Sequence, residues 1–429
     1  MKYAFALLCY RLLLLLLTPL LVVALVIRSI NHKAYRNRLL ERLGIVPKGF
    51  LKGGLIIHAS SVGEVLALKP LVTELLITHP TVPITFTTFT PTGSEQVIKH
   101  FGDRVQHCYL PIDNPISSLL FLKALSPKSF IVMETELWPN IIAQAHSRGT
   151  QLQLINARLS NKSMKSYRKL TWLITPCLNR FDDILCQSHD NKENFVSLGS
   201  PSSKTSVSGN LKYDIKLTSE IIDKQKELAS YIESSRPIWL VASTHPGDED
   251  IVLSAFEQVL QSTPECLLIL VPRHPERFND IAKRCESRFN TVRRSTKNPV
   301  SQTHQIWLMD SLGELMAAFS LADVVTMGGS FSQIGGHNPL EPAFYCKPII
   351  VGPNMSNFKE VTETMRRGEG IVQLSNDSDA YTDELAQRVM TILTVPQKQK
   401  ELGENARKVV DQNQGALAVT TKKISQYLV

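Results

Sequence analysis

Short apolar runs alternate with longer stretches of mixed polarity from residue 53 onward. In the first half the apolar runs are GLIIHA, VPITFTTF, SFIVM, QLQLINA and DILCQS, and each precedes a segment with helical periodicity. Nearly continuous apolar strands that alternate with helices are typical of a parallel sheet covered by helices on both faces. The pattern therefore predicts a doubly wound α/β domain.

The same rhythm restarts near residue 236, after a polar helical stretch. The later apolar runs are PIWLVAS, CLLILVP, QIWLMD, DVVTMG and KPIIVG. We predict a first Rossmann-like domain at 34–217, a linker at 218–235 and a second Rossmann-like domain at 236–429, whose last helix can pack back on the first. Because ligands of such sheets bind beyond the carboxyl ends of the strands, two facing domains predict a cleft between them.

The N-terminal segment, residues 1–33, reads as a membrane anchor. Residues 12–27 are apolar except for Thr18 and Pro19, and snorkelling of Arg11 extends the segment towards the roughly 20 residues that a bilayer span needs. No small-residue cleavage site closes it, which argues against a signal peptide. We expect a single-pass or monotopic anchor. A membrane-parallel helix is disfavoured by the lack of polar residues for a wet face.

Charge and cysteine content limit which ligands and which cellular location the chain is expected to have. Lys and Arg number 47 against 39 Asp and Glu, a net charge of +8 that attracts anionic lipid, phosphorylated ligands or nucleic acid. The chain has no nucleic-acid-binding fingerprint, and its densest basic cluster follows the apolar segment, which favours anionic lipid and a cytoplasmic location for the rest. Seven scattered cysteines without a CxxC pair argue against a disulfide framework or a zinc site.

Two acidic motifs follow predicted strands of the first half. HASSVGE ends at Glu64, which has the spacing of a capping box with Ser61. Glu64 either only caps its helix or takes a proton from an incoming hydroxyl, and the spacing leaves both open. METELWPN places Glu134 and Glu136 two residues apart, either as solvated loop acids or as carboxylates whose pKa values are pushed apart.

Cations follow two further strands of the first half. Lys212 in GNLKYD lies where the halves join, and a cation there could neutralise charge on a leaving phosphate. The second set of cations begins after the strand QLQLINA. It either forms a solvent-exposed helix face or binds an anionic acceptor. It consists of Arg158, Lys162, Lys165 and Arg168.

The second half offers two motifs suited to a nucleotide. Arg273, after Pro272 in VPRHPERF, suits bidentate phosphate recognition. Gly313 in SLGEL, between Leu312 and Glu314, has the conformational freedom that would let nearby backbone amides approach a base or ribose.

The stretch GGSFSQIGGHNPLEPA, residues 328–343, predicts a loop before a helix. Asn338 is expected as the N-cap, Pro339 as the first helical residue and Glu341 as the capping-box partner. The glycine pair at 335–336 would let a phosphate approach the helix N-terminus. The loop matches neither the P-loop nor GxGxxG, so ATP hydrolysis and NAD binding have no support.

Together these motifs resemble the 3-deoxy-D-manno-octulosonic acid (Kdo) transferases of lipopolysaccharide assembly. HASSVGE, METELWPN, NARLS, GNLKYD, VPRHPERF, LGEL, GGHNPLE and the NF at 357–358 occur in that family's order, over residues 1 to about 370. The resemblance implies the GT-B fold and a bacterial inner-membrane anchor with cytoplasmic catalytic domains. It also implies inverting transfer of Kdo from CMP-Kdo to a lipid A precursor, lipid IVA, without metal or cofactor.

The resemblance also implies roles for individual residues. Glu64 is expected as the general base, and Glu134 and Lys212 as the pair that stabilises the transition state. The CMP site is expected to comprise Pro272, Arg273, Leu312, Gly313, Glu314, Asn338, Pro339, Leu340 and Glu341.

Two other functions remain open at this stage. One is another GT-B enzyme, such as a nucleotide-sugar epimerase or a different lipid glycosyltransferase. The other is an inactive binding module, which the retained base and cations disfavour. None of the motifs indicates how many Kdo residues are added.

Overall fold

The computed structural model describes residues 2–31, 35–36, 38–159 and 161–428; the side chains of residues 2, 3, 31, 161 and 162 lie outside that description. The chain forms two compact units. The first unit comprises Met1–Asp214 and Gln414–Val429, and the second comprises Ile215–Asn413. Each unit contains one seven-stranded sheet, in which all the pairings are parallel.

The first sheet has the strand order β3-β2-β1-β4-β5-β6-β7. The chain moves from β1 to one edge and then returns to β4 on the other side of β1, so the order reverses between these two strands. In open parallel sheets, ligands bind beyond the carboxyl ends of the strands at such a reversal. The strands are β1 (Leu55–Ala59), β2 (Ile84–Thr88), β3 (Gln106–Tyr109), β4 (Ser129–Met133), β5 (Gln151–Ala157), β6 (Asp183–Cys186) and β7 (Thr205–Val207).

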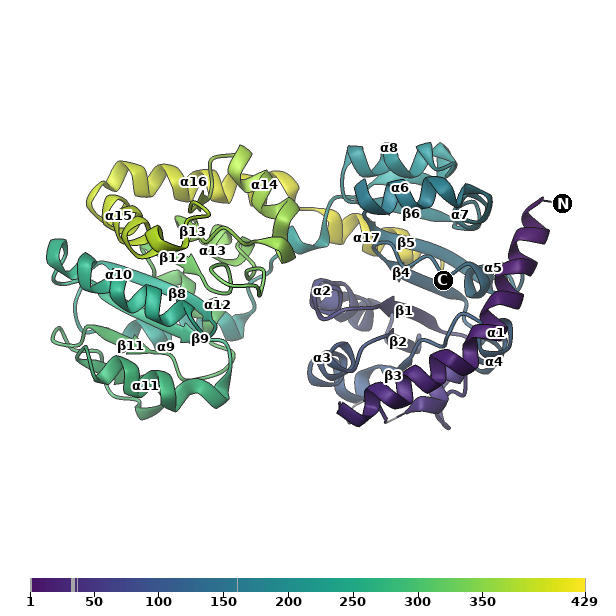
Figure 1. The fold of residues 1–429 in the computed structure, drawn as a ribbon, viewed down its shortest axis with the longest axis horizontal. Helices are drawn as coiled ribbons and strands as arrows, with labels where there is room; N and C mark the ends of the chain where they lie inside the picture. Colours follow the sequence, from purple (N-terminus) through teal and green to yellow (C-terminus); the bar gives the residue numbers. More distant parts are fainter. Residues whose placement is uncertain (1, 32–34, 37, 160, 429) are drawn as a thin grey trace. The chain divides into compact units, whose positions relative to one another are not determined.

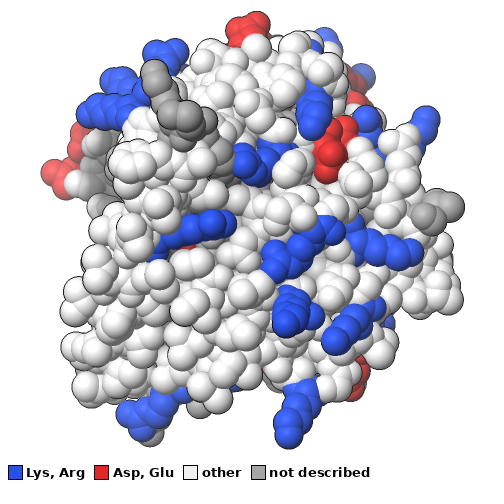
Figure 2. Space-filling view, turned by 90° about the vertical axis from the view of Figure 1, so that its right-hand side faces the viewer, with Lys and Arg blue, Asp and Glu red and all other residues white. Residues whose placement is uncertain are grey.

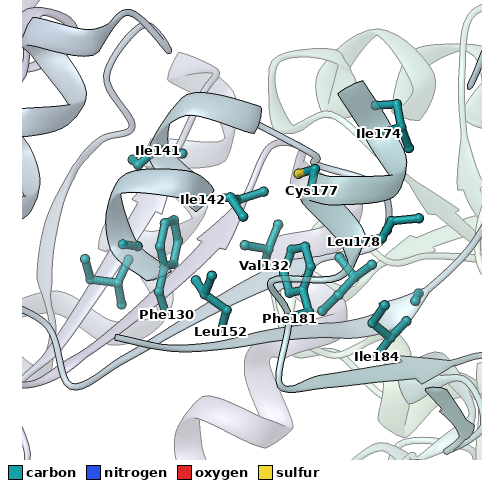
Figure 3. Close-up of a cluster of buried hydrophobic side chains, with 14 of the residues drawn as sticks. Phe130, Val132, Ile141, Ile142, Leu152, Ile174, Cys177, Leu178, Phe181 and Ile184 are labelled. Carbon is teal, nitrogen blue, oxygen red and sulfur yellow. The ribbon is translucent and has the colours of Figure 1, made fainter. Parts of the chain in front are cut away.

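Helices cover both faces of the first sheet because successive strand residues point to opposite sides. Phe130 and Val132 of β4 pack under one set of helices, whereas Ile131 and Met133 pack under the other. Figure 3 shows the first of these clusters, with strand and helix side chains interdigitating. One face carries α4 (Pro115–Leu125), α5 (Pro139–His146), α6 (Asn161–Lys169), α7 (Thr171–Leu178) and α8 (His189–Ser197), and the other carries α2 (Val62–Thr78) and α3 (Pro91–Phe101).

The second sheet repeats this plan with the order β10-β11-β9-β8-β12-β13-β14, which reverses between β8 and β12. Its strands are β8 (Ile238–Thr244), β9 (Leu267–Pro272), β10 (Thr291–Arg293), β11 (Ile306–Leu308), β12 (Val324–Met327), β13 (Ile349–Val351) and β14 (Val372–Gln373). Its helices are α9 (Ser219–Ser230), α10 (Asp248–Ser262), α11 (Phe278–Glu286), α12 (Leu315–Ala318), α13 (Leu340–Phe344), α14 (Lys359–Arg367), α15 (Tyr381–Thr394) and α16 (Pro396–Asn413).

The compact units divide the chain at other residues than the expected boundaries, and the last helix packs on the first unit, which the expectation had allowed. The segment 218–235, predicted as a linker, belongs to the second unit, where α9 packs on α12. The second unit ends at Asn413 rather than at 429, because α17 (Ala416–Ser425) packs on α2 of the first unit. The Asp214 carboxylate accepts the backbone N–H groups of Gly415 and Leu417, both at 2.8 Å, and so holds the start of α17.

The N-terminal apolar segment forms one long helix, α1 (Lys2–Asn31). Its stretch Ala4–Ile30 has a mean hydropathy of 2.6 and, among the described residues, is the one helix long and apolar enough to cross a membrane. The helix runs along the face of the first unit that α5 and α7 cover (Figure 1).

Candidate active site

Glu64 lies at the start of α2, just beyond β1 and therefore at the reversal of the first sheet. Ser61 is the N-cap, and its Oγ accepts the Glu64 N–H at 3.4 Å. The Glu64 carboxylate accepts hydrogen bonds from the Ser60 N–H (2.9 Å), the Ser60 hydroxyl (2.9 Å) and the Ser61 hydroxyl (2.8 Å). The backbone N–H that it binds is that of Ser60, one residue before the position expected in a capping box. Three donors thus fix the carboxylate.

The protonation of Glu64 is set mainly by its burial. Its side chain is buried, and burial, reinforced by the negative charge of Glu134, raises the pKa of Glu64 to about 7. The hydrogen bonds from Ser60 and Ser61 oppose this rise because they favour the ionised form. Glu64 therefore exchanges its proton near neutral pH, which is where a general base works best.

Glu134 and Lys212 form an ion pair in the first unit. Lys212 Nζ lies 3.7 Å from Glu134 Oε1, and both side chains are about one-fifth exposed. Glu134 follows β4 with a φ of 54°, and its N–H donates to the Ile155 carbonyl at 3.0 Å. A residue other than glycine in this left-handed region costs roughly 1–2 kcal/mol, and such residues gather at functional sites. The structure thus brings together the three residues expected to act in catalysis with their side chains only partly accessible.

A second left-handed residue, Asn156, supports the segment that carries Lys212. Asn156 lies in β5 with a φ of 49°, and its Oδ1 accepts the Leu211 N–H at 3.0 Å. Asn210 Oδ1 in turn accepts the Lys212 N–H at 3.0 Å. Sequence reasoning did not single out Asn156. Its signal was an asparagine, a residue type tolerant of the left-handed region, near the end of a strand and at the start of the NARLS motif.

Glu136 has partners different from those of Glu134. Its Oε2 accepts the Trp138 indole N–H at 3.0 Å and lies 3.9 Å from His58 Nε2. Burial lowers the pKa of His58 to about 3 and raises that of Glu136 above its usual value. The imidazole is therefore neutral, and the Glu136–His58 contact is not an ion pair at neutral pH.

A group of basic side chains surrounds the carboxyl ends of β8 and β9 in the second unit. The His245 ring lies 5.0 Å from that of His274 and stacks on His337 at 5.1 Å, with the two Nε2 atoms 2.8 Å apart. Arg273 is exposed, and among the described residues its guanidinium makes neither a hydrogen bond nor an ion pair. Burial first, and then the neighbouring cations, lower the pKa of His337 to about 4. We call Arg273 and these three histidines the Arg–His cluster.

Asp248 joins two loops at the reversal of the second sheet. Its Oδ2 accepts the N–H of His245, beyond β8, at 2.9 Å and that of Gly329, beyond β12, at 2.6 Å. Burial raises the pKa of Asp248 to about 6. The loop from β12 and the Arg–His cluster are thereby held together. Neither His245, His337 nor Asp248 was predicted as a site residue. His245 and Asp248 follow the apolar strand β8, and His337 lies in the GGHNPLE motif, which were the available signals.

The helix after this loop begins one residue later than predicted: α13 starts at Leu340, and its N-cap is Pro339 rather than Asn338. The helix α13 is one short turn, and Asn338 Oδ1 accepts the Leu340 N–H at 3.2 Å. Glu341 does not bind backbone: its Oε1 accepts from the Asn338 side-chain amide at 3.2 Å. Within the described part of the chain, Glu341 Oε2 has no hydrogen-bond donor. Burial raises the pKa of Glu341 above its usual value.

The glycine pair before α13 is required by packing. Gly335 and Gly336 have φ values of 94° and 74°. A Cβ at Gly336 would lie 2.2 Å from the Met355 sulfur, and one at Gly335 would lie 2.4 Å from the Ser356 hydroxyl. Close contact with the segment 354–357 and the positive φ values explain the glycines, and ligand access at this loop stays a prediction.

In the SLGEL loop, hydrogen bonds hold the Glu314 side chain, whereas the backbone at 312–313 is accessible. Glu314 accepts hydrogen bonds from Arg294 Nε (3.2 Å) and Nη2 (2.8 Å), and Arg294 also reaches Glu227. Leu312 is 62% exposed, and Gly313, with a φ of 81°, has no atom within 4 Å of the position a Cβ would take. Arg294 was not foreseen, because nothing in its surrounding sequence marks it.

The cations expected to bind the acceptor are only partly connected to this site. The Arg158 carbonyl accepts a hydrogen bond from the Thr135 hydroxyl, which ties it to the loop that carries Glu134. Lys165 and Arg168 are exposed on α6. The side chain of Lys162 lies outside the described residues.

The residues that the structure describes contain no group of three or more His, Cys, Asp or Glu side chains that could hold a metal ion.

Two solved structures identify the fold. A UDP-GlcNAc 2-epimerase from Neisseria meningitidis is 15% identical, with a TM-score of 0.54 over 87% of this chain and 100% of its own. A glycosyltransferase from Rickettsia africae is 15% identical, with a TM-score of 0.53 over 88% and 98%. These likenesses show the fold alone, and that fold is GT-B, with two Rossmann-like units.

Sequence relatives then identify the family. The family model described as 3-deoxy-D-manno-octulosonic-acid transferase matches residues 37–215. A 3-deoxy-D-manno-octulosonic acid transferase from Haemophilus influenzae is 39% identical over 98% of both chains. One from Rickettsia felis is 32% identical over 87% of this chain and 79% of its own. The chain belongs to the Kdo transferase family and is a glycosyltransferase of lipopolysaccharide biosynthesis.

The glycine packing generates a stability prediction. We expect Gly336→Ala to lower the free energy of unfolding by roughly 1–3 kcal/mol more than Gly313→Ala does, because both have positive φ but only Gly336 faces a packed sulfur. Urea denaturation of both variants measures the difference. Equal losses would contradict the packing explanation and leave backbone conformation as the sole cause.

Proposed function

We propose that this chain transfers Kdo from CMP-Kdo to a hydroxyl of a lipid A precursor, lipid IVA, with inversion at the anomeric carbon. The observation that carries the proposal is the buried Glu64 carboxylate beyond β1, with its pKa raised to about 7 and three hydrogen-bond donors fixing it. A carboxylate of this kind can remove the proton of an attacking hydroxyl at neutral pH. An epimerase with the same fold would not need an acceptor alcohol.

Glu64 acts as the general base in this mechanism. Its carboxylate takes the acceptor hydroxyl proton as the acceptor oxygen forms a bond to the anomeric carbon of Kdo. The bond from that carbon to the phosphate oxygen breaks, and CMP leaves with the electron pair. Attack on the face opposite the leaving group inverts the configuration.

Glu134 and Lys212 stabilise the charges that develop in this step. The sugar ring gains positive charge, which the Glu134 carboxylate offsets, and the departing phosphate gains negative charge, which the Lys212 ammonium offsets. Their 3.7 Å separation and partial exposure support the proposal, because each retains surface for a substrate. The left-handed backbone at Glu134 fixes the direction of its side chain.

The second unit binds the donor. We assign CMP to Pro272, Arg273, the loop Leu312–Glu314 and the segment Asn338–Glu341. Among the described residues the Arg273 guanidinium has no partner, which supports recognition of the phosphate, and the exposed backbone at 312–313 suits the base. Glu341 Oε2, without a donor in the described part of the protein, leaves an oxygen for a ribose hydroxyl.

The first unit binds the acceptor at the bacterial inner membrane, with both units in the cytoplasm. Arg158, Lys162, Lys165 and Arg168 are proposed to contact the phosphates of the lipid A precursor, and exposure of Lys165 and Arg168 supports this. The apolar helix α1 and the net charge of +8 support attachment to a membrane that contains anionic lipid.

The reaction itself is tested with the purified full chain, CMP-Kdo and lipid IVA. We expect the mass of the lipid to rise by one or more Kdo residues, with release of an equal amount of CMP. Mass spectrometry of the lipid products measures both activity and the number of sugars added. Release of CMP without a heavier lipid, or no reaction, would contradict the proposal.

The raised pKa of Glu64 predicts the pH dependence of the rate. Since only ionised Glu64 accepts a proton, kcat/KM should fall as the pH drops through about 7. Glu64→Gln should lose roughly 100-fold or more in kcat and lack this limb, with unchanged CMP affinity. Ser61→Ala is the matched control. It should cost about 1 kcal/mol of stability and move the limb to higher pH, because the lost hydroxyl favoured the ionised carboxylate.

A purely structural Glu64 would give the opposite pattern. In that case Glu64→Gln would lose only the roughly 1 kcal/mol typical of a lost cap and would keep its transfer rate.

Arg273 is predicted to bind the donor phosphate. Arg273→Ala should weaken CMP binding roughly 10-fold or more, the loss expected for hydrogen bonds to a charged group. Titration calorimetry with CMP measures it. Arg284→Ala serves as the control, because Arg284 pairs with Asp250 and Asp280 on the surface of the same unit. Equal affinities of the two variants would refute the assignment.

A further inference from the structure

Two histidines of the Arg–His cluster share a hydrogen bond through their rings. His245 follows β8 and His337 precedes α13; the ring planes are 8° from parallel, and the two Nε2 atoms are 2.8 Å apart. A hydrogen bond between two imidazole nitrogens needs one N–H donor and one lone-pair acceptor. Because His245 is only 7% exposed, the contact is a built part of the second unit. We call these two residues the histidine pair.

The backbone around the histidine pair is shaped to hold it. Ser243, two residues before His245, has a φ of 59°, and such strained residues gather at functional sites. A Cβ at Gly329 would lie 3.2 Å from Cδ2 of His337 and 3.3 Å from Cδ2 of His245, so a larger residue would press on both rings. The carboxylate of Asp248 holds the N–H groups of His245 and Gly329. The two rings therefore have a fixed relative position.

The histidine pair has one hydrogen-bond donor left for a ligand. Burial first, and then the neighbouring basic groups, lower the pKa of both rings, that of His337 to about 4, so both are neutral at pH 7. Two neutral imidazoles carry two ring protons, one of which lies between the Nε2 atoms. Among the described residues, neither Nδ1 atom has a hydrogen-bond partner. One Nδ1 is therefore an N–H donor and the other a lone-pair acceptor.

Basic groups face the histidine pair from the neighbouring strand end. The N–H of Arg273, just beyond β9, donates to the Thr244 carbonyl at 3.1 Å, which places Arg273 beside His245. The charges of Arg273 and His274 both contribute to the lowered pKa of each ring in the pair. An anion bound at this place would oppose that effect and favour a further proton on the pair.

The acidic groups near the histidine pair already have other partners. Glu249, buried on α10, accepts two hydrogen bonds from Arg277, both at 2.9 Å. Asp248 accepts two backbone N–H groups through Oδ2. Glu276 lies 3.6 Å from His274 Nδ1, and both of these side chains are exposed. Among the described residues, no carboxylate accepts a hydrogen bond from the pair, which leaves it without an anionic partner of its own.

Cations elsewhere on the surface are arranged differently. Figure 2, which views the side of the first unit where α1 lies in Figure 1, shows Lys and Arg scattered over a surface that is otherwise largely uncharged. Such isolated exposed charges are screened by salt and attract any anion. The histidine pair instead has a fixed geometry and a charge that depends on one proton, which suits a particular anionic group.

The donor assigned to the second unit has two anionic groups close together. In Kdo, an ulosonic acid, the carboxylate carbon is bonded directly to the anomeric carbon, and the oxygen on that carbon is bonded to phosphorus in CMP-Kdo. The sugar carboxylate therefore lies next to the phosphate, for which Arg273 is proposed. Carboxylate oxygens accept hydrogen bonds and donate none. A carboxylate can use the Nδ1–H of one ring but not the lone pair of the other.

We propose that the histidine pair binds the carboxylate of the donor sugar and takes up one proton from solvent as it does so. The proposal rests on the proposed function, because it names the part of CMP-Kdo that the two residues recognise. The added proton gives both Nδ1 atoms an N–H while the hydrogen bond between the Nε2 atoms remains. The pair then has one positive charge, and its hydrogen bonds to the carboxylate are charge-assisted.

Two ligands that differ at the carboxylate test the proposal. The full chain is titrated by calorimetry, without acceptor, with CMP-Kdo and with the methyl ester of CMP, which keeps the phosphodiester and lacks the carboxylate. His337→Phe should weaken CMP-Kdo binding roughly 10-fold, the loss expected for hydrogen bonds to a charged group, and change the affinity for the methyl ester less than about two-fold. His304→Gln is the matched control, because the His304 ring is bonded to Ser301 in the same unit. It should bind both ligands as the wild type does.

Proton uptake is the second measurement. Titrations at pH 7 in buffers of different ionisation enthalpy give the number of protons bound together with the ligand. The wild type should take up more protons with CMP-Kdo than with the methyl ester, and its affinity for CMP-Kdo should rise as the pH falls from 8 to 6. His337→Gln keeps an amide donor and acceptor beside His245 but cannot be protonated, so this difference between the two ligands should disappear.

Three results would contradict the proposal. Equal losses of affinity for both ligands in His337→Phe would show that the pair serves the phosphate or the fold. Unchanged affinity for both would show that it contacts no ligand, and equal proton uptake with the two ligands in the wild type would remove the protonation step. The proposed function fails separately, if wild-type protein binds neither ligand or leaves lipid IVA unchanged.

Discussion

Parallel strand pairing is the constraint on which both halves of this enzyme depend. Because β1 pairs with β2 on one side and β4 on the other, the segments after β1 and β4 diverge at one edge of the sheet. Glu64 and Glu134 come from those two segments, and the Lys212 ammonium reaches Glu134 from beyond β7. The same reversal between β8 and β12 brings His245 and Gly329 to one carboxylate, Asp248. One topological rule thus assembles two chemically different sites.

Burial and local contacts determine how the acidic side chains at these positions are protonated and paired. At Glu64, burial outweighs three hydrogen bonds, so its pKa rises to about 7 although each donor favours ionisation. Burial also raises the pKa of Glu136, which contacts a neutral His58 and the Trp138 indole. Glu134 instead pairs with the Lys212 ammonium. Two acids separated by one residue therefore have different surroundings. The spacing of the two acids does not reveal this difference, which comes from what each side chain contacts.

Much of the fold could be predicted from sequence, because apolar strands and helices with 3.6-residue periodicity record which faces are buried. Glu64, Glu134 and Lys212 could be named because they follow strands in motifs of the family. Contacts between residues distant in sequence left no such trace: the Arg294–Glu314 pair joins residues 20 apart. The return of the last helix was allowed for, but not the Asp214 carboxylate, some 200 residues earlier, that holds its start. The glycines at 335–336 were foreseen, but not their cause, since Met355 and Ser356 meet them only in the folded chain.

The return of α17 also determines when the first unit can finish folding. Ala416, Leu417, Ile424 and Leu428 belong to the same buried cluster as the strands β1 and β2. The N-terminal part of this unit, which includes the apolar helix α1, leaves the ribosome early. The residues of α17, which complete that core, leave the ribosome only when translation ends. The unit that is synthesised first is therefore the one completed last. During synthesis, the face of α2 that α17 later covers remains exposed. A nascent chain attached to the membrane would therefore have an incomplete hydrophobic core until translation ends.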